Sequence, residues 1–273
     1  MTEWRLLPYQ VKNGFNNMAV DEAILQIHSQ GKTPPTLRFY GWKPPALSLG
    51  YFQSLEEKVD RESCRTRGID VVRRLTGGRA ILHDQELTYS LTVREELNLL
   101  DSSIVKSYKE ISQGLVKGLK KLDIPVSLTP RQKGQKAPRG DSAACFDTPS
   151  WYEVVIGGKK LIGSAQTRKW ETILQHGSLP LTLDADLIFN LFKIDNERRR
   201  KRLKRFFLKH STGLYQHTEK KYSPKTLEKY LVQGLSDHFA IEIQPGSLTE
   251  EEQQLAAELS RKKYSQKSWN ARK

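Results

Sequence analysis

Hydrophobic and polar positions along this chain repeat with two different periods, and each period predicts a type of secondary structure. Apolar residues at helical spacing predict helices over 14–28, 54–67, 102–122, 184–208, 223–239 and 248–264. Runs rich in β-branched and aromatic residues predict strands over 36–42, 46–52, 69–74, 151–156, 159–166, 179–184 and 241–246, with a further strand after His83. Residues 129–144 are basic, rich in proline and glycine and without periodicity, so we expect a mobile loop suited to gating a substrate.

Short sequence signals mark several boundaries between these elements. The pair Gly157-Gly158 predicts a two-residue hairpin turn between two strands. Ser223 followed by Pro224 predicts the start of a helix, and Thr249 is expected to cap the last one. These signals act within a few residues, so they place turns and helix starts without any knowledge of the fold.

The first predicted helix begins near two asparagines. Asn16 or Asn17 is expected to cap it. Asp21 and Glu22 follow in its early turns, where carboxylates complement the helix dipole. We therefore expect these two acids to be solvated, and we assign them no catalytic role.

Length and cysteine usage narrow the class of protein. At 273 residues the chain fits one large domain, or a main domain with a small appendage. It has no apolar run of about 18 residues, which a transmembrane helix needs, and its first residues lack the features of a signal peptide. Two cysteines, Cys64 and Cys145, form no disulfide framework and lack zinc spacing, which favours a cytoplasmic protein with reduced thiols.

A net charge of +14 indicates acidic partners. Nucleic acid and acidic proteins fit this charge equally well. Much of the excess lies in the last third of the chain, notably in the run 198–205. Such a run is typical of a solvated helix face, and a docking surface is the alternative.

The chemistry is expected to depend on Cys145 and Lys160. The thiol precedes the predicted hairpin, and the lysine lies at the start of its second strand. A free thiol is mostly protonated at neutral pH, and a nearby ammonium favours the thiolate. We therefore predict that the two side chains meet and form a nucleophile pair. No lysine or histidine lies within one helical turn of Cys64, which is predicted to be structural.

The segment RRLTGGRA, followed by a histidine, is the second chemical candidate. Its paired glycines, Gly77 and Gly78, let a loop pass close to a ligand or adopt positive φ. Arg73 and Arg74 could bind a carboxylate, a phosphate or a pantetheine phosphodiester, and an ordinary β-turn with exposed arginines is the alternative. His83 fits a structural role and a site role equally well.

Three motifs in this order resemble the lipoate/biotin protein ligase superfamily, and within it the cysteine-dependent octanoyltransferases of bacterial lipoate assembly (LipM type). They are RRLTGGRAILHDQELTYS at 73–90, SAACFDTPSWYEV at 142–154 and GGKKLIGSAQTR at 157–168. The resemblance covers essentially the whole chain. It implies an α/β fold with a mixed central β-sheet flanked by helices. Residues 1–248 would form the catalytic domain, including the mobile loop, and 249–273 a C-terminal helix and tail packed on that domain.

The resemblance also implies roles and partners. Cys145 would accept the octanoyl group as a thioester, and Lys160 would lower the thiol pKa and assist transfer. The acyl and pantetheine pocket would be lined by Arg74, Gly77, Gly78, His83, Gly163, Ser164 and Ala165. The donor would be octanoyl-acyl carrier protein, and the acceptor a lysine of a lipoyl-domain protein such as the glycine-cleavage H protein. No metal, cofactor, membrane or nucleic acid is expected.

Small residues in the second strand of the predicted hairpin, 159–166, are consistent with an acyl pocket beside that strand. Gly163, Ser164 and Ala165 form a run of small side chains inside it. Such a run indicates that another group approaches the strand backbone closely. Backbone amides near Gly163, or in the turn near Gly77, are both candidates for donors to the oxyanion of an acyl-transfer intermediate.

Three alternative functions remain open. An ATP-dependent lipoate–protein ligase would share the fold, but TGGRA differs from the SGGG loop of those ligases, and Cys145 has no role in their chemistry. An octanoyl amidotransferase acting between lipoyl domains also uses a cysteine, although RRLTGGRA fits the first-step enzyme better. A non-enzymatic basic module that binds nucleic acid would leave the arrangement of Cys145, hairpin and Lys160 unexplained.

Overall fold

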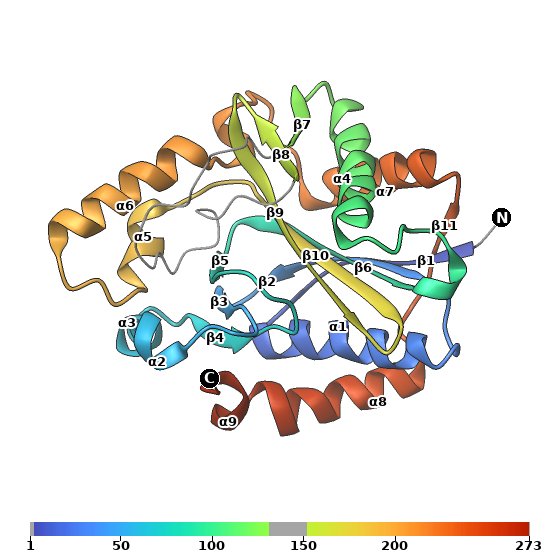
Figure 1. The fold of residues 1–273 in the computed structure, drawn as a ribbon, viewed down its shortest axis with the longest axis horizontal. Helices are drawn as coiled ribbons and strands as arrows, with labels where there is room; N and C mark the ends of the chain where they lie inside the picture. Colours follow the sequence, from blue (N-terminus) through green and yellow to red (C-terminus); the bar gives the residue numbers. More distant parts are fainter. Residues whose placement is uncertain (1–2, 131–151, 273) are drawn as a thin grey trace.

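The computed structural model describes residues 3–130 and 152–272 (Figure 1). Cys145 and all of the predicted mobile loop except Thr129 and Pro130 lie outside this range. The strands are β1 (Glu3–Lys12), β2 (Thr36–Trp42), β3 (Ala46–Leu49), β4 (Asp70–Arg73), β5 (Ile81–His83), β6 (Glu86–Arg94), β7 (Val126–Pro130), β8 (Tyr152–Ile156), β9 (Lys159–Lys169), β10 (Thr172–Pro180) and β11 (Glu242–Pro245).

The helices lie between and after these strands. The α-helices are α1 (Gly14–Ser29), α2 (Leu55–Lys58), α3 (Arg61–Thr66), α4 (Ile104–Lys120), α5 (Ala185–Asn190), α6 (Glu197–His210), α7 (Pro224–Phe239), α8 (Glu250–Leu259) and α9 (Lys267–Asn270). Short 3-10 or π segments are η1 (Glu95–Leu97), η3 (Leu214–Gln216) and η4 (Ser260–Tyr264). Within the described residues, no helix is long and apolar enough to cross a membrane.

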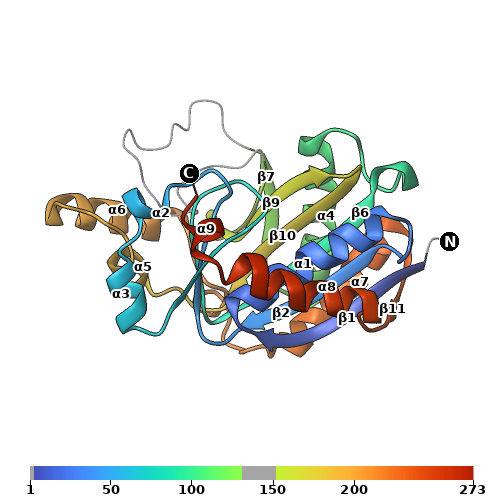
Figure 2. The same ribbon diagram turned by 90° about the horizontal axis from the view of Figure 1, so that it is seen from below.

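Two sheets organise the molecule. The large sheet has the order β11-β1-β2-β6-β10-β9-β8-β7, and β4-β3-β5 form a small one. Strand β1 pairs in parallel with β11 and β2, and the remaining neighbours of the large sheet are antiparallel. Helices α1 and α8 cover one face of the large sheet, and α4 and α7 cover the other (Figures 1 and 2). This arrangement confirms the predicted α/β fold with a mixed sheet flanked by helices.

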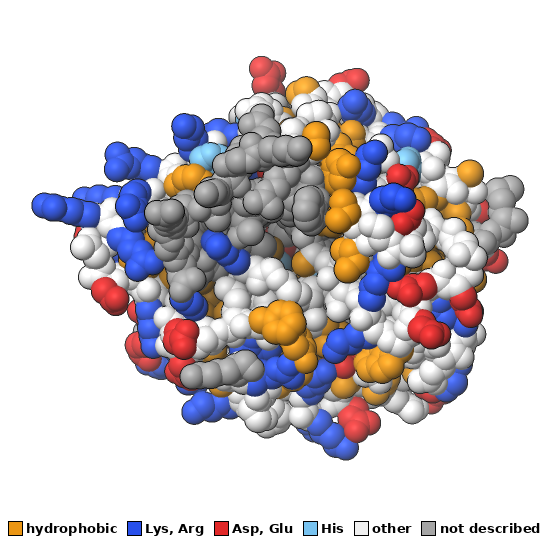
Figure 3. Space-filling view, viewed as in Figure 1, with side chains coloured by type: hydrophobic (Ala, Val, Ile, Leu, Met, Phe, Trp, Pro, Cys, Tyr) orange, Lys and Arg blue, Asp and Glu red, His pale blue; other side chains and the backbone are white. Residues whose placement is uncertain are grey.

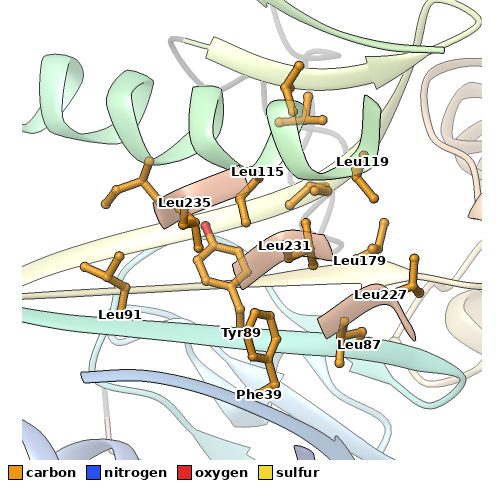
Figure 4. Close-up of a cluster of buried hydrophobic side chains, with 14 of the residues drawn as sticks. Phe39, Leu87, Tyr89, Leu91, Leu115, Leu119, Leu179, Leu227, Leu231 and Leu235 are labelled. Atoms are coloured by element: carbon orange, nitrogen blue, oxygen red, sulfur yellow. The ribbon is translucent and has the colours of Figure 1, made fainter. Parts of the chain in front are cut away.

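The main hydrophobic core lies between the large sheet and helices α4 and α7 (Figure 4). Strand β6 contributes Leu87, Tyr89 and Leu91, whose side chains point toward the two helices. The leucines that face them are Leu115 and Leu119 of α4 and Leu227, Leu231 and Leu235 of α7. Burying these side chains removes apolar surface from water, which fixes the sheet against the helices.

The local boundary signals are confirmed. Strands β8 and β9 pair antiparallel around Gly157 and Gly158, whose φ angles of +55° and +72° lie in the left-handed region that favours glycine. Helix α7 begins with Ser223 as cap and Pro224 at its start, and Thr249 caps α8 in a reciprocal capping box. These turns and caps are set by neighbouring residues, so the sequence alone predicts them.

Two of the long predicted helices are divided, and one strand is displaced. The stretch 54–67 forms α2 and α3, and 184–208 forms α5 and α6. In each case an internal cap starts a new helix: Asp60 accepts a hydrogen bond from Ser63 N at 2.9 Å, and Asn196 accepts one from Arg198 N at 2.8 Å. Strand β10 begins at Thr172, earlier than predicted, and β1 and β7 were not expected.

The prediction that the two acidic residues of α1 are solvated is wrong. Asn13 is the cap, and Asn17 is buried. Asp21 and Glu22 are only 2% and 3% exposed, because α1 lies between the sheet and α8. Asp21 accepts a hydrogen bond at 2.6 Å from Arg38 of the sheet, and Glu22 binds side chains of η4. These carboxylates therefore join layers of the fold.

Candidate active site

A pocket lies where the small sheet meets the large one. Its wall combines apolar side chains and glycines with hydroxyls, two imidazoles and a guanidinium. The lining residues are Met18, Tyr40, Trp42, Ser48, Arg74, Ile81, His83, Thr88, Gly163, Ser164, Ala165, His176, Gly177 and Ser178. A site of this composition can hold an apolar chain beside a polar reacting group.

The structure brings most of the predicted pocket residues together. Arg74, His83, Gly163, Ser164 and Ala165 all line the pocket, although they come from three separate parts of the chain. The last three lie in β9, opposite β10. Small side chains there leave room for a ligand along the strand.

The predicted glycine pair, Gly77 and Gly78, is not among the residues that line this pocket. Gly78 has φ +91°, and its carbonyl oxygen would lie 1.9 Å from a side chain added at Gly50. The carbonyl of Gly77 accepts a hydrogen bond at 2.9 Å from Arg74 Nη2. The two glycines thus allow a close backbone crossing that holds Arg74 in place.

The N–H groups of Arg74 donate hydrogen bonds to acceptors within the protein. They reach the carbonyl and hydroxyl of Ser48 at 2.9 and 3.1 Å and the hydroxyl of Thr76 at 3.1 Å. They also reach the carbonyls of Gly77 and Arg79 at 2.9 and 2.7 Å. Together these contacts engage all five donors of a guanidinium. In this structure Arg74 braces the loop that follows β4, and its predicted role in binding substrate stays a prediction.

Arg73 fastens the C-terminal segment to the site. Its side chain is 0% exposed and donates to backbone carbonyls of Gly50, Tyr51 and Gln53 in one loop. It also donates to the carbonyls of Trp269, Asn270 and Arg272 near the C-terminus. Both sequence interpretations of Arg73, an exposed turn residue or an anion ligand, are therefore wrong, because carbonyl oxygens surround its guanidinium.

His83 lies in a hydrogen-bonded chain at the pocket wall. Its Nε2 is 2.7 Å from Ser48 Oγ, and its Nδ1 is 2.8 Å from Glu86 Oε1. The Trp42 ring stacks on the imidazole, with centroids 4.0 Å apart and planes 9° apart. Glu86 also accepts hydrogen bonds from Thr88 and Ser178. Burial opposes ionisation of Glu86, but the neighbouring His83 and the hydrogen bonds from His83, Ser178 and Thr88 hold the pKa of Glu86 below its ordinary value.

His176 occupies a second chain of the same kind. Its Nε2 is 2.7 Å from Thr76 Oγ1, and its Nδ1 is 3.4 Å from Asp21 Oδ2. Burial lowers the pKa of His176, although the Asp21 carboxylate opposes the shift. Asp21 is bound more tightly by Arg38 at 2.6 Å and Tyr40 at 2.8 Å. This chain of hydrogen bonds therefore joins α1, β2 and β10 at the pocket wall.

Lys160 is buried on β9, three residues before the first pocket glycine. Its side chain is 4% exposed, and its Nζ lies 3.2 Å from Glu153 Oε1 on β8. The neighbouring Lys159 is more exposed, and its Nζ donates to the carbonyl of Leu208 at 2.8 Å. The two lysines thus have different environments, and a contact between Lys160 and Cys145 falls outside the described residues.

The basic run forms α6, at the edge of the molecule beside α5 (Figures 1 and 3). Lys204 is bound to Asp186, and Arg200 reaches the carbonyl of Phe189 at 2.8 Å. The helix buries Leu203 and Phe207 and presents most of its cationic side chains to solvent. A solvated helix face, as the sequence suggested, and a surface for acidic partners are compatible here.

Comparison with known proteins identifies the family. Residues 13–236 match the model of the lipoyl protein ligase A/B catalytic domain. The octanoyltransferase LipM of Moorella thermoacetica is 46% identical over 99% of this chain and 98% of its own length. The octanoyltransferase LipM of Kyrpidia tusciae is also 46% identical, over 100% of both chains. This chain belongs to the LipM octanoyltransferases. Octanoyl transfer in lipoate biosynthesis follows from that membership.

Comparison with solved structures shows that this chain has the fold of the lipoate ligases. A bipartite lipoate protein ligase from Thermoplasma acidophilum matches with a TM-score of 0.81 and 26% identity, over 100% of this chain and 99% of its own. A lipoate-protein ligase A bound with ATP matches with a TM-score of 0.77 and 26% identity, over 98% of each chain. Transferases and ligases therefore share one fold, so the fold does not separate the two chemistries.

Several site residues of this LipM chain escaped sequence reasoning. Ser48 lies inside a predicted strand and His176 just before another, so no sequence signal gave a reason to select them. Glu86 carried a weak signal, because it follows His83 by three residues. Asp84, which follows His83 directly in the chain, has a pKa that is raised by burial and by the charge of Glu86. The fold directs Glu86, at the start of β6, toward the imidazole.

Proposed function

We propose that this LipM-family enzyme transfers octanoyl from octanoyl-acyl carrier protein to a lysine of a lipoyl domain, through a thioester on Cys145. The glycine-cleavage H protein is the expected first acceptor. Full-length identity of 46% to LipM octanoyltransferases carries the proposal. The position of Cys145 in the motif SAACFDTPSWYEV supplies the nucleophile.

The chemistry needs no nucleotide. Attack of a cysteine thiolate on octanoyl-carrier protein exchanges one thioester for another, so the first step is nearly isoenergetic. The amine of the acceptor lysine then attacks the enzyme thioester and forms an amide. An amide is more stable than a thioester, so this second step is favourable.

The pocket supports an apolar acyl chain. Met18, Trp42 and Ile81 supply apolar walls, and Gly163 and Gly177 keep the facing strands free of bulky side chains. Each CH2 group buried from water contributes about 0.8 kcal/mol. Burial of the CH2 groups of an octanoyl chain against these side chains would contribute to its binding.

The net positive charge of the chain favours association with acidic protein partners. The chain carries a net charge of +14, and α6 presents many of its cationic side chains to solvent. Carrier and lipoyl proteins with acidic surfaces would be steered toward such a molecule.

A direct test of the intermediate is the intact mass of the enzyme after incubation with octanoyl-acyl carrier protein and no acceptor. We expect the mass to rise by one octanoyl group and to return to its starting value with hydroxylamine, which cleaves thioesters. Adding a lipoyl domain should remove the group from the enzyme and place it on the domain. An enzyme that modifies the domain without ever carrying octanoyl would contradict the proposal.

Lys160 is proposed to stabilise the thiolate of Cys145. Replacing Lys160 with alanine should slow alkylation of Cys145 by iodoacetamide at neutral pH, by about tenfold for each unit by which the thiol pKa rises. The alkylation rate should recover as the pH increases, because the thiol then ionises without help. The measurement is the alkylation rate across pH, read by mass.

Lys159 provides the matched control. It is the adjacent lysine, but its Nζ binds the carbonyl of Leu208 at the surface. Lys159→Ala should therefore leave the alkylation profile unchanged. If Lys160→Ala has the profile of the wild type, Lys160 does not set the thiol pKa.

A further inference from the structure

Two large aromatic side chains are exposed near the pocket. Phe52 is 83% exposed, and Trp170 is 52% exposed. Phe52 follows Tyr51 in the loop after β3, and Trp170 lies in the turn between β9 and β10. Exposed apolar side chains are ordinary when they are scattered over a surface, and they mark interaction sites when they form a contiguous patch.

Cations connect these rings into one surface. The Tyr51 ring meets the Phe52 ring edge-on, with centroids 4.9 Å apart. Lys169 Nζ lies 5.3 Å from the ring centroid of Tyr51 and 5.8 Å from that of Trp170. Arg272 Cζ lies 4.0 Å from the ring centroid of Tyr51. The aromatic patch defined by these contacts consists of Tyr51, Phe52, Lys169, Trp170, Trp269 and Arg272.

The turn that carries Trp170 is strained. It has two residues, and both have φ in the left-handed region, +51° at Trp170 and +53° at Glu171. Asparagine and glycine favour such a turn, whereas a bulky residue there is unfavourable. Backbone strain that is kept at an exposed side chain indicates a function other than stability. The strain therefore joins the exposure of Trp170 as a sign of a binding surface.

The charge around the patch is positive. The hydrogen bond from Arg272 lowers the pKa of Tyr51, and the charges of Arg272 and Lys169 act in the same direction. Glu171 is the acidic residue next to Trp170 in the turn. Figure 3 shows hydrophobic and cationic side chains beside one another in the lower half of the face that it draws. Such a surface fits a partner whose carboxylates surround an apolar side chain.

The patch is joined to the wall of the pocket. Tyr51 N donates to the carbonyl of Thr76 at 2.9 Å. Thr76 Oγ1 in turn lies 2.7 Å from His176 Nε2, and His176 lines the pocket. Arg73 donates to the carbonyls of both Tyr51 and Arg272, at 3.0 and 2.8 Å. A protein bound to the patch is therefore close to a substrate bound in the pocket.

The reach of the two protein substrates decides which of them this surface suits. The acceptor presents a lysine, whose side chain is a four-carbon stem, so the acceptor's own surface must approach the acyl group closely. The carrier protein presents the acyl group on a pantetheine arm, which is much longer, so its surface can dock farther from the pocket. A surface joined to the pocket wall therefore suits the acceptor.

We propose that the aromatic patch docks the lipoyl domain that accepts the octanoyl group, an inference that rests on the proposed function. Phe52 and Trp170 pack against apolar side chains of the domain, and Lys169 and Arg272 pair with carboxylates around them. Aromatic and arginine side chains carry much of the binding free energy at protein interfaces, so a few residues of the patch suffice to hold the domain.

The test measures binding and transfer separately. Affinity for an unmodified lipoyl domain is measured by titration calorimetry, and transfer is followed after the enzyme has been loaded from octanoyl-acyl carrier protein. Phe52→Ala should weaken binding about tenfold and slow transfer to a limiting amount of domain by a similar factor. A large excess of domain should restore its transfer rate, because docking affects KM and not the chemical step. Loading should stay within about twofold of wild type.

Reversing a charge tests the electrostatic part of the proposal. Lys169→Glu should weaken binding of the lipoyl domain by about tenfold at low salt, because a carboxylate then faces the acidic partner. The difference from wild type should shrink as salt is added, since salt screens exposed charges.

Ile104 provides the matched control. It is also a large exposed apolar side chain, at 55%, but it lies at the start of α4, outside the patch. Ile104→Ala should therefore leave binding, loading and transfer as they are in wild type.

Three outcomes would overturn the docking surface. They are wild-type affinity and transfer in Phe52→Ala, an equal loss in Ile104→Ala, and a loss confined to loading, which would assign the patch to the carrier protein. If wild type never carries octanoyl, the proposed function fails, but the binding titration still decides whether the patch holds the lipoyl domain.

Discussion

Replacing Cys145 with alanine is expected to lower octanoyl transfer by about 10³-fold or more, because the thioester cannot form without the thiol. The variant should also show no gain of mass with octanoyl-acyl carrier protein. The measurement is octanoylation of a lipoyl domain, read by mass at matched enzyme concentration. Full transfer by Cys145→Ala would refute the covalent mechanism.

The other cysteine is the control. Cys64 is 1% exposed in the cluster around α3, and burial raises its thiol pKa to about 11. At neutral pH this thiol stays protonated and has no path to a substrate. Cys64→Ala should therefore keep both loading and transfer. A loss of stability from the smaller side chain is measured separately by thermal unfolding, so that it is not mistaken for lost chemistry.

The second large effect separates transferase from ligase. A ligase must activate a free acid with a nucleotide before an amine can attack it, whereas a transferase begins from a thioester that is already activated. We expect full octanoylation of a lipoyl domain from octanoyl-acyl carrier protein with a chelator present and ATP absent. Free octanoate with ATP and magnesium should give at least about 10²-fold less product, since the second step would lack its activated donor.

The same reaction shows which alternative holds if this expectation fails. Modification that depends strictly on ATP and is indifferent to Cys145 would assign ligase chemistry to the chain. The assignment of the fold would not change, because the ATP-bound lipoate-protein ligase A has the same architecture, with a TM-score of 0.77. Octanoyl taken only from an octanoylated H protein, and never from carrier protein, would favour the amidotransferase.

The sequence alone determined the features that depend on near neighbours. The turn at Gly157-Gly158 and the caps at Ser223 and Thr249 were predicted because each is set by residues within about four positions along the chain. The family resemblance was also available, because its three motifs are contiguous stretches. The contact between Cys145 and Lys160 and the boundary of the catalytic domain stay predictions.

Only the tertiary structure decided what the polar side chains do. Asp21 was expected in solvent, but helix α1 is covered on both sides, and burial without a partner is too costly for a carboxylate, so it binds Arg38. Arg73 was a candidate anion ligand, but the C-terminal segment returns to it with carbonyl oxygens. The sequence fitted a structural and a site role of His83 equally well, and only the structure shows that Ser48, from another strand, lies at its Nε2. Such pairings join residues far apart in the chain, and strand order and layer packing, which local patterns do not encode, bring them together.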